Sequence, residues 1–75
     1  MRTLAQLRIG QKARVTTIHG MDDISIRLLE MGLTPGVEVM LVGSAPLGDP
    51  LELEVRGYHL SVRKSEAARV ELDAN

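Results

Sequence analysis

Two histidines and a few carboxylates are the side chains of this sequence that could bind a metal ion. His19 and His59, with Asp22, Asp23 or Glu30, offer nitrogen and oxygen ligands of the kind that divalent first-row metals accept. The two histidines lie far apart in the sequence, and neither belongs to a cluster with the spacing of a dedicated site. We therefore expect no required cofactor. Any divalent metal should be held weakly, by His19, His59 or surface carboxylates, with fewer than three protein ligands.

Arrangements that support catalysis are missing from the sequence. The chain has no cysteine, no Gly-x-Ser-x-Gly elbow, no Gly-rich phosphate loop followed by Lys-Ser/Thr and no His-Glu-x-x-His helix. The neighbours Asp22 and Asp23 could act as an acid and base, but two acids at the start of a helix more often cap it and interact with its dipole. The sequence therefore predicts a protein that is not an enzyme.

Composition limits the remaining classes of function. A chain of 75 residues has room for one domain, which we place at residues 1–75. Nine basic and ten acidic residues give a net charge of −1, and Tyr58 is the only aromatic residue. Nucleic acid is not an expected partner, because its binding relies on basic surfaces and stacked aromatic rings. Tyr58 itself either recognises a partner or packs its ring inward.

The N-terminal residues do not resemble a targeting or membrane segment. Gln6 and Arg8 interrupt the first apolar residues, and no apolar run approaches the length that crosses a bilayer. We expect a cytoplasmic protein without direct membrane insertion. Leu4, Leu7 and Ile9, which precede Gly10, predict a short turn that packs its apolar side chains under the domain as a lid.

Alternation of apolar and polar residues predicts several short strands. The clearest alternation begins at residue 51 and reverses at Gly57, as in a β-hairpin. Because closing a sheet removes the exposed edges of short strands, we expect a mainly β fold. It should be a small five-stranded barrel with one inserted α-helix and short helical turns. The expected strands are residues 12–18, 37–41, the two arms of a hairpin over 51–63, and 70–72.

One segment has the period of a helix, over residues 22–31. Gly32 and Pro35 follow it and are suited to end it. Asp23 and Arg27 have the spacing of an ion pair along the helix. The residues expected to face the core are Met21, Ile24, Leu28 and Met31.

Two apolar residues of this helix lie on its other side. Ile26 and Leu29 fall opposite the core face, beside Arg27 and Glu30. Either the N-terminal lid or a loop covers them, or they form a docking patch for a partner helix or a second copy of the chain. We expect Ile26, Arg27, Leu29 and Glu30 to form part of a partner-binding surface.

Four blocks of the sequence resemble the FeoA family. In order they are LRIG, RLLEMGLTPG, APLGDPL and GYHLSVRKSEA, at residues 7–10, 27–36, 45–51 and 57–67. The resemblance extends from Leu4 to about Leu72. It implies an SH3-like barrel with an inserted helix, and it favours the docking interpretation of Ile26 and Leu29.

The resemblance also implies a function. It points to an accessory or regulatory protein of bacterial ferrous iron transport that binds the cytosolic part of a FeoB-type transporter, which carries a GTP-binding domain. The chain could also associate with itself. The barrel is similar to the C-terminal domain of iron-dependent repressors, so the alternative is a sensor or carrier module for Fe2+ or a similar ion.

Overall fold

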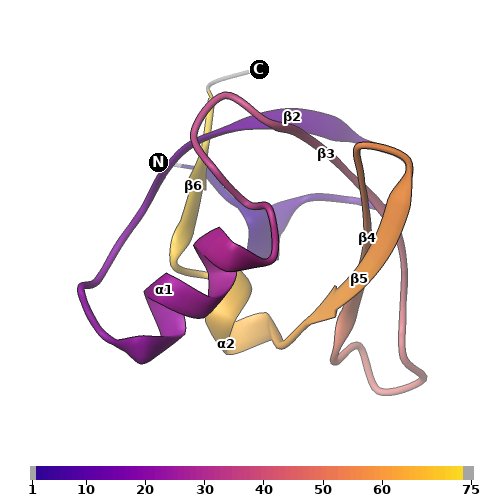
Figure 1. The fold of residues 1–75 in the computed structure, drawn as a ribbon. Coiled ribbons are helices and arrows are strands. Elements are labelled where there is room, and N and C mark those ends of the chain that lie inside the picture. Colours follow the sequence, from indigo (N-terminus) through magenta and orange to yellow (C-terminus); the bar gives the residue numbers. More distant parts are fainter. Residues whose placement is uncertain (1, 74–75) are drawn as a thin grey trace.

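The computed structural model describes residues 2–73 as a curved antiparallel sheet with helices on one side (Figure 1). Six strands pair in the order β1-β6-β2-β3-β4-β5. The strands are β1 Arg2–Thr3, β2 Lys12–Ile18, β3 Glu38–Ser44, β4 Leu51–Val55, β5 Tyr58–Val62 and β6 Val70–Leu72. A 3-10 helix, η1 Leu4–Gln6, follows β1, and the α-helices are α1 Asp23–Glu30 and α2 Lys64–Ala67.

The expected mainly β fold with one inserted helix and short helical turns is confirmed, and two details of the sheet differ. A sixth strand, β1, pairs with β6 through Arg2↔Leu72 and Thr3↔Glu71. The end strands β1 and β5 are not paired with each other, so the sheet is strongly curved without closing into a barrel. Closure requires a partner for both end strands, and β1 is only two residues long.

The core lies inside the curve of the sheet. Strand alternation supplies most of it, because successive side chains of a strand point to opposite faces. In β4, for example, Leu51, Leu53 and Val55 are buried, whereas Glu52 and Glu54 between them are partly exposed. The other buried apolar residues, from helices, strands and the loops between them, are Leu4, Leu7, Ala13, Val15, Leu28, Leu33, Val37, Val39, Leu41, Val62, Ala67, Val70 and Leu72.

The N-terminal lid is confirmed in part. Leu4 and Leu7 are buried, and the backbone N–H of Leu7 donates to the carbonyl of Leu4 across η1. Ile9 was expected to pack with them, but its side chain is 66% exposed. It directly precedes the turn at Gly10, whose φ is +89°, and the chain there has left the core.

Helix α1 begins and ends close to the predicted positions. The Asp22 side chain accepts from the N–H of Ser25, at 3.2 Å, as an N-cap does. At the other end Gly32 takes φ +107°, and the N–H of Leu33 donates to the carbonyl of Leu28. Leu28 is fully buried, and Ile24 and Met31 pack against the core.

Met21 was expected on the buried face of this helix and is instead 99% exposed. Because Asp22 is the N-cap, Met21 lies outside the helix and does not follow its period. Ser25 is buried in the first turn, with 4% of its surface exposed. Its hydroxyl donates to the carbonyl of Asp22, at 2.8 Å, so the buried polar group is satisfied.

Candidate functional site

Helix α1 is fastened to the C-terminal part of the domain by two ion pairs. Near its start, Arg69 Nη1 lies 2.5 Å from Asp22 Oδ1. The hydrogen bond from Arg69, helped by the N–H of Ser25, lowers the pKa of the Asp22 carboxyl from 3.8 to about 2. The same contact raises the pKa of the Arg69 guanidinium. Asp22 thus caps α1 and also joins it to the segment between α2 and β6.

The second ion pair connects α1 to α2. The guanidinium of Arg27 pairs with the Glu66 carboxylate. The expected pair along the helix, Asp23 with Arg27, does not form, because Glu66 lies closer to the guanidinium on the neighbouring helix. Glu66 also accepts from the N–H of Arg63 at the start of α2. Arg27 therefore has a structural partner, while 55% of its side chain stays exposed.

Tyr58 holds the other end of α1. Its hydroxyl donates to the carbonyl of Met31, at 2.7 Å, where a helix leaves carbonyl groups unpaired. A Cβ at Gly32 would overlap that hydroxyl, so this position needs glycine for space as well as for its positive φ. As a whole, Tyr58 is 44% exposed. Tyr58 thus contacts the helix with its hydroxyl and keeps part of its ring at the surface.

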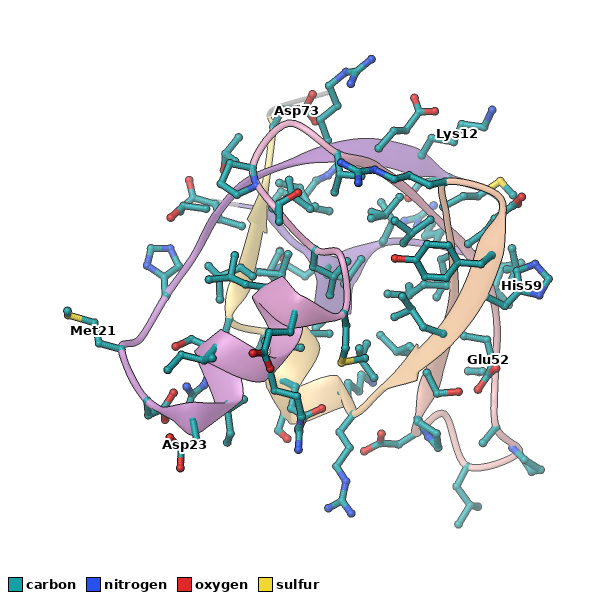
Figure 2. All side chains as sticks on the ribbon, viewed as in Figure 1. Lys12, Met21, Asp23, Glu52, His59 and Asp73 are labelled. Atoms are coloured by element: carbon teal, nitrogen blue, oxygen red, sulfur yellow. The ribbon has the colours of Figure 1, made fainter. Side chains whose placement is uncertain are left out.

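The four residues predicted to bind a partner all lie on α1. Ile26 is 51% exposed and Leu29 40% exposed, whereas Leu28 between them is fully buried. Arg27 and Glu30 are exposed on the same helix. In Figure 2 the labelled Asp23 lies at the start of this helix with its carboxylate directed away from the sheet. We call Ile26, Arg27, Leu29 and Glu30 the α1 surface.

The two candidate metal-binding histidines lie at different places along the sheet. His19 follows β2, and its Nε2 is 2.7 Å from Glu71 Oε1. His59 is exposed on β5 opposite Glu54, at the side of the molecule away from Met21 (Figure 2). The strand order puts β3 and β4 between β2 and β5. Within residues 2–73 no three or more histidine, aspartate or glutamate side chains gather where they could hold a metal ion.

A shallow hollow lies on the outer face of the sheet, which the sequence patterns did not single out. Its volume is about 430 Å³, and it extends over β2, β3 and the β4–β5 turn. Lys12, Arg14 and Arg56 line it together with Glu38 and Glu54. The alternation of polar and apolar residues predicts that these side chains face outward. That they lie next to one another follows from the order of the strands and could not be predicted from the alternation. These mixed charges suit solvation, and no arrangement for acid–base or nucleophilic chemistry is present among them.

The loop between β3 and β4 carries another exposed apolar residue that sequence reasoning treated only as part of a turn. Leu47 is 96% exposed. The loop around it is ordered by two backbone bonds, from Ala45 N–H to the Pro50 carbonyl and from Gly48 N–H to the Ala45 carbonyl. Asp49 accepts from the N–H of Lys64, at 3.0 Å, and so joins the loop to α2.

None of the helices in residues 2–73 has the length and apolarity needed to cross a membrane.

Comparison with protein families and known proteins gives consistent results. A family model described as "FeoA domain" matches residues 2–74. A curated protein of Porphyromonas gingivalis, the Fe(2+) transport protein A/Fe(2+) transporter FeoB fusion protein, is 33% identical over 70 residues. That match covers 93% of this chain but only 8% of the fusion protein.

Solved structures share the fold. The crystal structure of Stenotrophomonas maltophilia FeoA complexed with zinc is 37% identical, with a TM-score of 0.86, and the match covers 99% of this chain and 92% of that one. A manganese-dependent transcriptional repressor is 13% identical with a TM-score of 0.81, over 92% of this chain and 39% of the repressor. At that identity the second likeness shows a common fold and nothing further.

Proposed function

Because this chain belongs to the FeoA domain family, which is associated with ferrous iron transport, we propose that it is a non-enzymatic accessory protein that binds the cytosolic part of a FeoB-type transporter. The observation that carries this proposal is the α1 surface. A helix on a small sheet needs one apolar side to pack, and Ile24, Leu28 and Met31 supply it. Ile26 and Leu29 are apolar residues beyond those that pack α1 on the sheet, and both are exposed.

The contacts that hold α1 to the rest of the domain support a role in binding. Its start is joined to Arg69, its middle to Glu66 and its end to Tyr58. A surface that is already ordered before binding loses less conformational entropy when a partner docks. Ile26 and Leu29 are therefore presented in a defined position, with the charged Arg27 and Glu30 at their sides.

The fusion protein of P. gingivalis supports the choice of partner. Its name places a transport protein A part and a transporter FeoB part on one polypeptide. Two parts joined in one chain meet at a high effective concentration, an arrangement that suits domains that work together. We propose the same association between separate chains for the present protein, in the cytoplasm, where that part of the transporter lies. We also propose that residues 1–75 form one domain.

A binding titration tests the proposal. The chain is titrated calorimetrically into the purified cytosolic domain of the transporter with no nucleotide, with GDP and with a slowly hydrolysed GTP analogue. Saturable binding in at least one of these states is expected. If none of them shows heat of binding, and cross-linking also finds no complex, the chain does not act through the transporter's cytosolic domain.

Metal binding is the second candidate function. It is favoured by the contact between His19 and Glu71, and by the S. maltophilia relative that was crystallised with zinc. His19 and Glu71 would supply two ligands, and His59 beside Glu54 would supply two at another position. Water or another molecule would have to complete either shell, so the affinity would be low. Anaerobic titration with Fe2+ distinguishes this function, because a sensor or carrier needs saturable binding at micromolar concentrations.

A further inference from the structure

Strand β5 forms an open edge of the sheet. Among the described residues 2–73 it pairs only with β4, from Leu51↔Val62 to Val55↔Tyr58. The turn between them consists of Arg56 and Gly57, both with positive φ, which is the geometry of a two-residue hairpin. In such a hairpin the residues beside the turn form a hydrogen-bonded pair, and the pairs then alternate. His59 and Ser61 therefore direct their backbone N–H and C=O groups away from β4.

In the part of the chain that the structure describes, no hydrogen-bond partner is found for these backbone groups. Among residues 2–73, none of the backbone hydrogen bonds outside the helices and ladders involves His59 or Ser61. Both residues are exposed, and β5 is an end strand of the sheet; in Figure 1 it passes in front of β4 and continues into α2. Four polar backbone groups of the domain thus face solvent along one short line.

The edge also lacks the features by which proteins usually block strand addition. Edge strands are commonly protected by proline, by a charged side chain, by a bulge or by being very short. The other end strand, β1, has only two residues. Strand β5 has five, contains no proline, lysine, arginine or acidic residue, and pairs with β4 without a register shift. This edge is therefore suited to accept another strand.

The side chains beside the edge indicate which strand would fit. On the outer face, Glu54 lies opposite His59, and Glu52 accepts from the Ser61 hydroxyl at 2.6 Å. The inner face carries the partly exposed Tyr58 and Leu60. A strand that adds here should carry neutral or basic residues toward the glutamates, and apolar residues toward Leu60.

The sequence of β5 itself has this alternation. His59 and Ser61 fall on one side, and Tyr58, Leu60 and Val62 on the other. We propose that β5 pairs antiparallel with β5 of a second copy of this chain, around a twofold axis at Leu60. Such an interface is isologous, since the same surface is used by both copies.

This register satisfies both the backbone and the side chains. His59 of each copy faces Ser61 of the other, so all four free backbone groups on each edge pair with their counterparts. The two Leu60 side chains meet at the axis on the apolar face. No acidic residue lies directly opposite another, because Glu52 and Glu54 are on β4, one strand away from the junction.

Sedimentation and amide exchange of the full chain test the proposal. Sedimentation equilibrium is measured from about 10 µM to about 1 mM, because a small interface gives a weak complex. We expect a monomer–dimer equilibrium, together with slower exchange of the His59 and Ser61 amides at high concentration. Ser61→Pro removes one outward N–H that the β4 ladder does not use, and it should weaken dimerisation at least about tenfold. Ser61→Ala keeps the N–H but loses the hydroxyl, so it should dimerise like the wild type.

Other results would overturn the proposal. These are a monomer over the whole range, a dimer that survives Ser61→Pro, or a dimer whose His59 and Ser61 amides exchange as fast as in the monomer. Protection of these amides only when the transporter's cytosolic domain is added would assign the edge to a different strand. If Ser61→Pro does not fold, the wild-type exchange rates still decide, since they need no substitution. The result of this test does not bear on the proposed docking at the α1 surface, because that surface consists of other residues.

Discussion

The Tyr58 hydroxyl donates a 2.7 Å hydrogen bond to the carbonyl of Met31, and in this way β5 holds the end of α1. Gly32, the next residue, has φ +107° and leaves the space that the hydroxyl occupies. Three residues from two distant parts of the sequence thus form one contact. This contact links the open sheet edge to the helix that carries the α1 surface.

Removing the hydroxyl should destabilise the domain modestly. Tyr58→Phe deletes one hydrogen bond at a partly exposed site, which is worth about 0.5–1.5 kcal/mol. In a domain of this size each kcal/mol moves the thermal midpoint by about 4–8 °C. Thermal unfolding followed by circular dichroism measures the change. Stability equal to that of the wild type would mean that the hydroxyl does not hold the helix end.

Gly32→Ala should be more harmful, and its effect should depend on Tyr58. The substitution forces a side chain into a left-handed conformation, at a cost of about 1–2 kcal/mol, and it also overlaps the hydroxyl. In the Tyr58→Phe background the overlap is gone and the strain remains. A double-mutant cycle should therefore show that the two changes together cost less than the sum of each alone. Additive effects would contradict the close packing of Gly32 on Tyr58.

Acid should weaken the attachment of α1 at Asp22. The folded-state pKa of Asp22 is about 2, below its ordinary value of 3.8. A lowered pKa contributes stability that is complete above the ordinary value and is lost as the pH falls from about 4 toward 2. Asp22→Asn keeps an N-cap acceptor but removes the charge. Its stability should therefore change less than that of the wild type across this pH window.

A matched variant separates this effect from general acid sensitivity. Glu30 is an exposed carboxylate of the same helix and forms no ion pair among residues 2–73. Glu30→Gln should lose stability between pH 4 and 2 as steeply as the wild type does. Asp22→Asn should lose less. Urea unfolding at a series of pH values compares the three proteins. If the stability of Asp22→Asn falls with pH as much as that of the wild type, the contact between Asp22 and Arg69 does not cause the acid sensitivity.

Local patterns predicted much of this fold. The helix, its acidic cap and the hairpin that turns at Gly57 all depend on neighbouring residues, and all three form; of the two candidate caps, Asp22 and Asp23, the structure uses Asp22. Met21 was misplaced because a shift of one residue at a helix start moves a side chain from the core to solvent. Such boundaries are the least certain part of a sequence-based prediction.

The contacts that build the candidate site were harder to predict, because they join distant residues. Asp23 has a suitable spacing for Arg27, but Glu66 on α2 takes that partner instead. Nothing near Tyr58 in the sequence indicates that its hydroxyl reaches Met31. The open edge of β5 depends on the order of the six strands in residues 2–73. Closure was expected because it removes the exposed edges of short strands. The helical period predicted that Ile26 and Leu29 lie opposite the core side of α1, but it left open whether the lid or a loop covers them, and the structure leaves both exposed.

Metal removal should leave the stability of the domain unchanged. Within residues 2–73 no three potential ligands gather. His19 follows β2 and His59 lies on β5, with β3 and β4 between these strands. Thermal unfolding with and without excess chelator should give the same midpoint. A ligand present at 100 times its dissociation constant would add about 2.7 kcal/mol, which is easily detected. A clear drop with chelator would show that a tightly bound metal supports the fold.

The α1 surface gives the most direct test of function. Ile26→Gln with Leu29→Gln should cost the fold little, because substitutions at exposed positions usually change stability by no more than about 0.5 kcal/mol. The same double change should weaken binding to the transporter's cytosolic domain strongly, since an apolar anchor at an interface can be worth about 2 kcal/mol or more. Thermal unfolding and calorimetric titration measure the two effects on one preparation.

Two control variants make the result specific to this surface. Leu47→Gln alters an equally apolar and even more exposed residue on the β3–β4 loop, and it should leave affinity unchanged if docking uses α1. Leu28→Ala alters the buried side of the same helix and should cost about 2–5 kcal/mol of stability. If the Ile26 and Leu29 double variant loses stability as Leu28→Ala does, while each folded molecule binds normally, these residues belong to the packing of the domain. Loss of affinity with stability retained, and with Leu47→Gln unaffected, is the result that the exposure of the two side chains predicts.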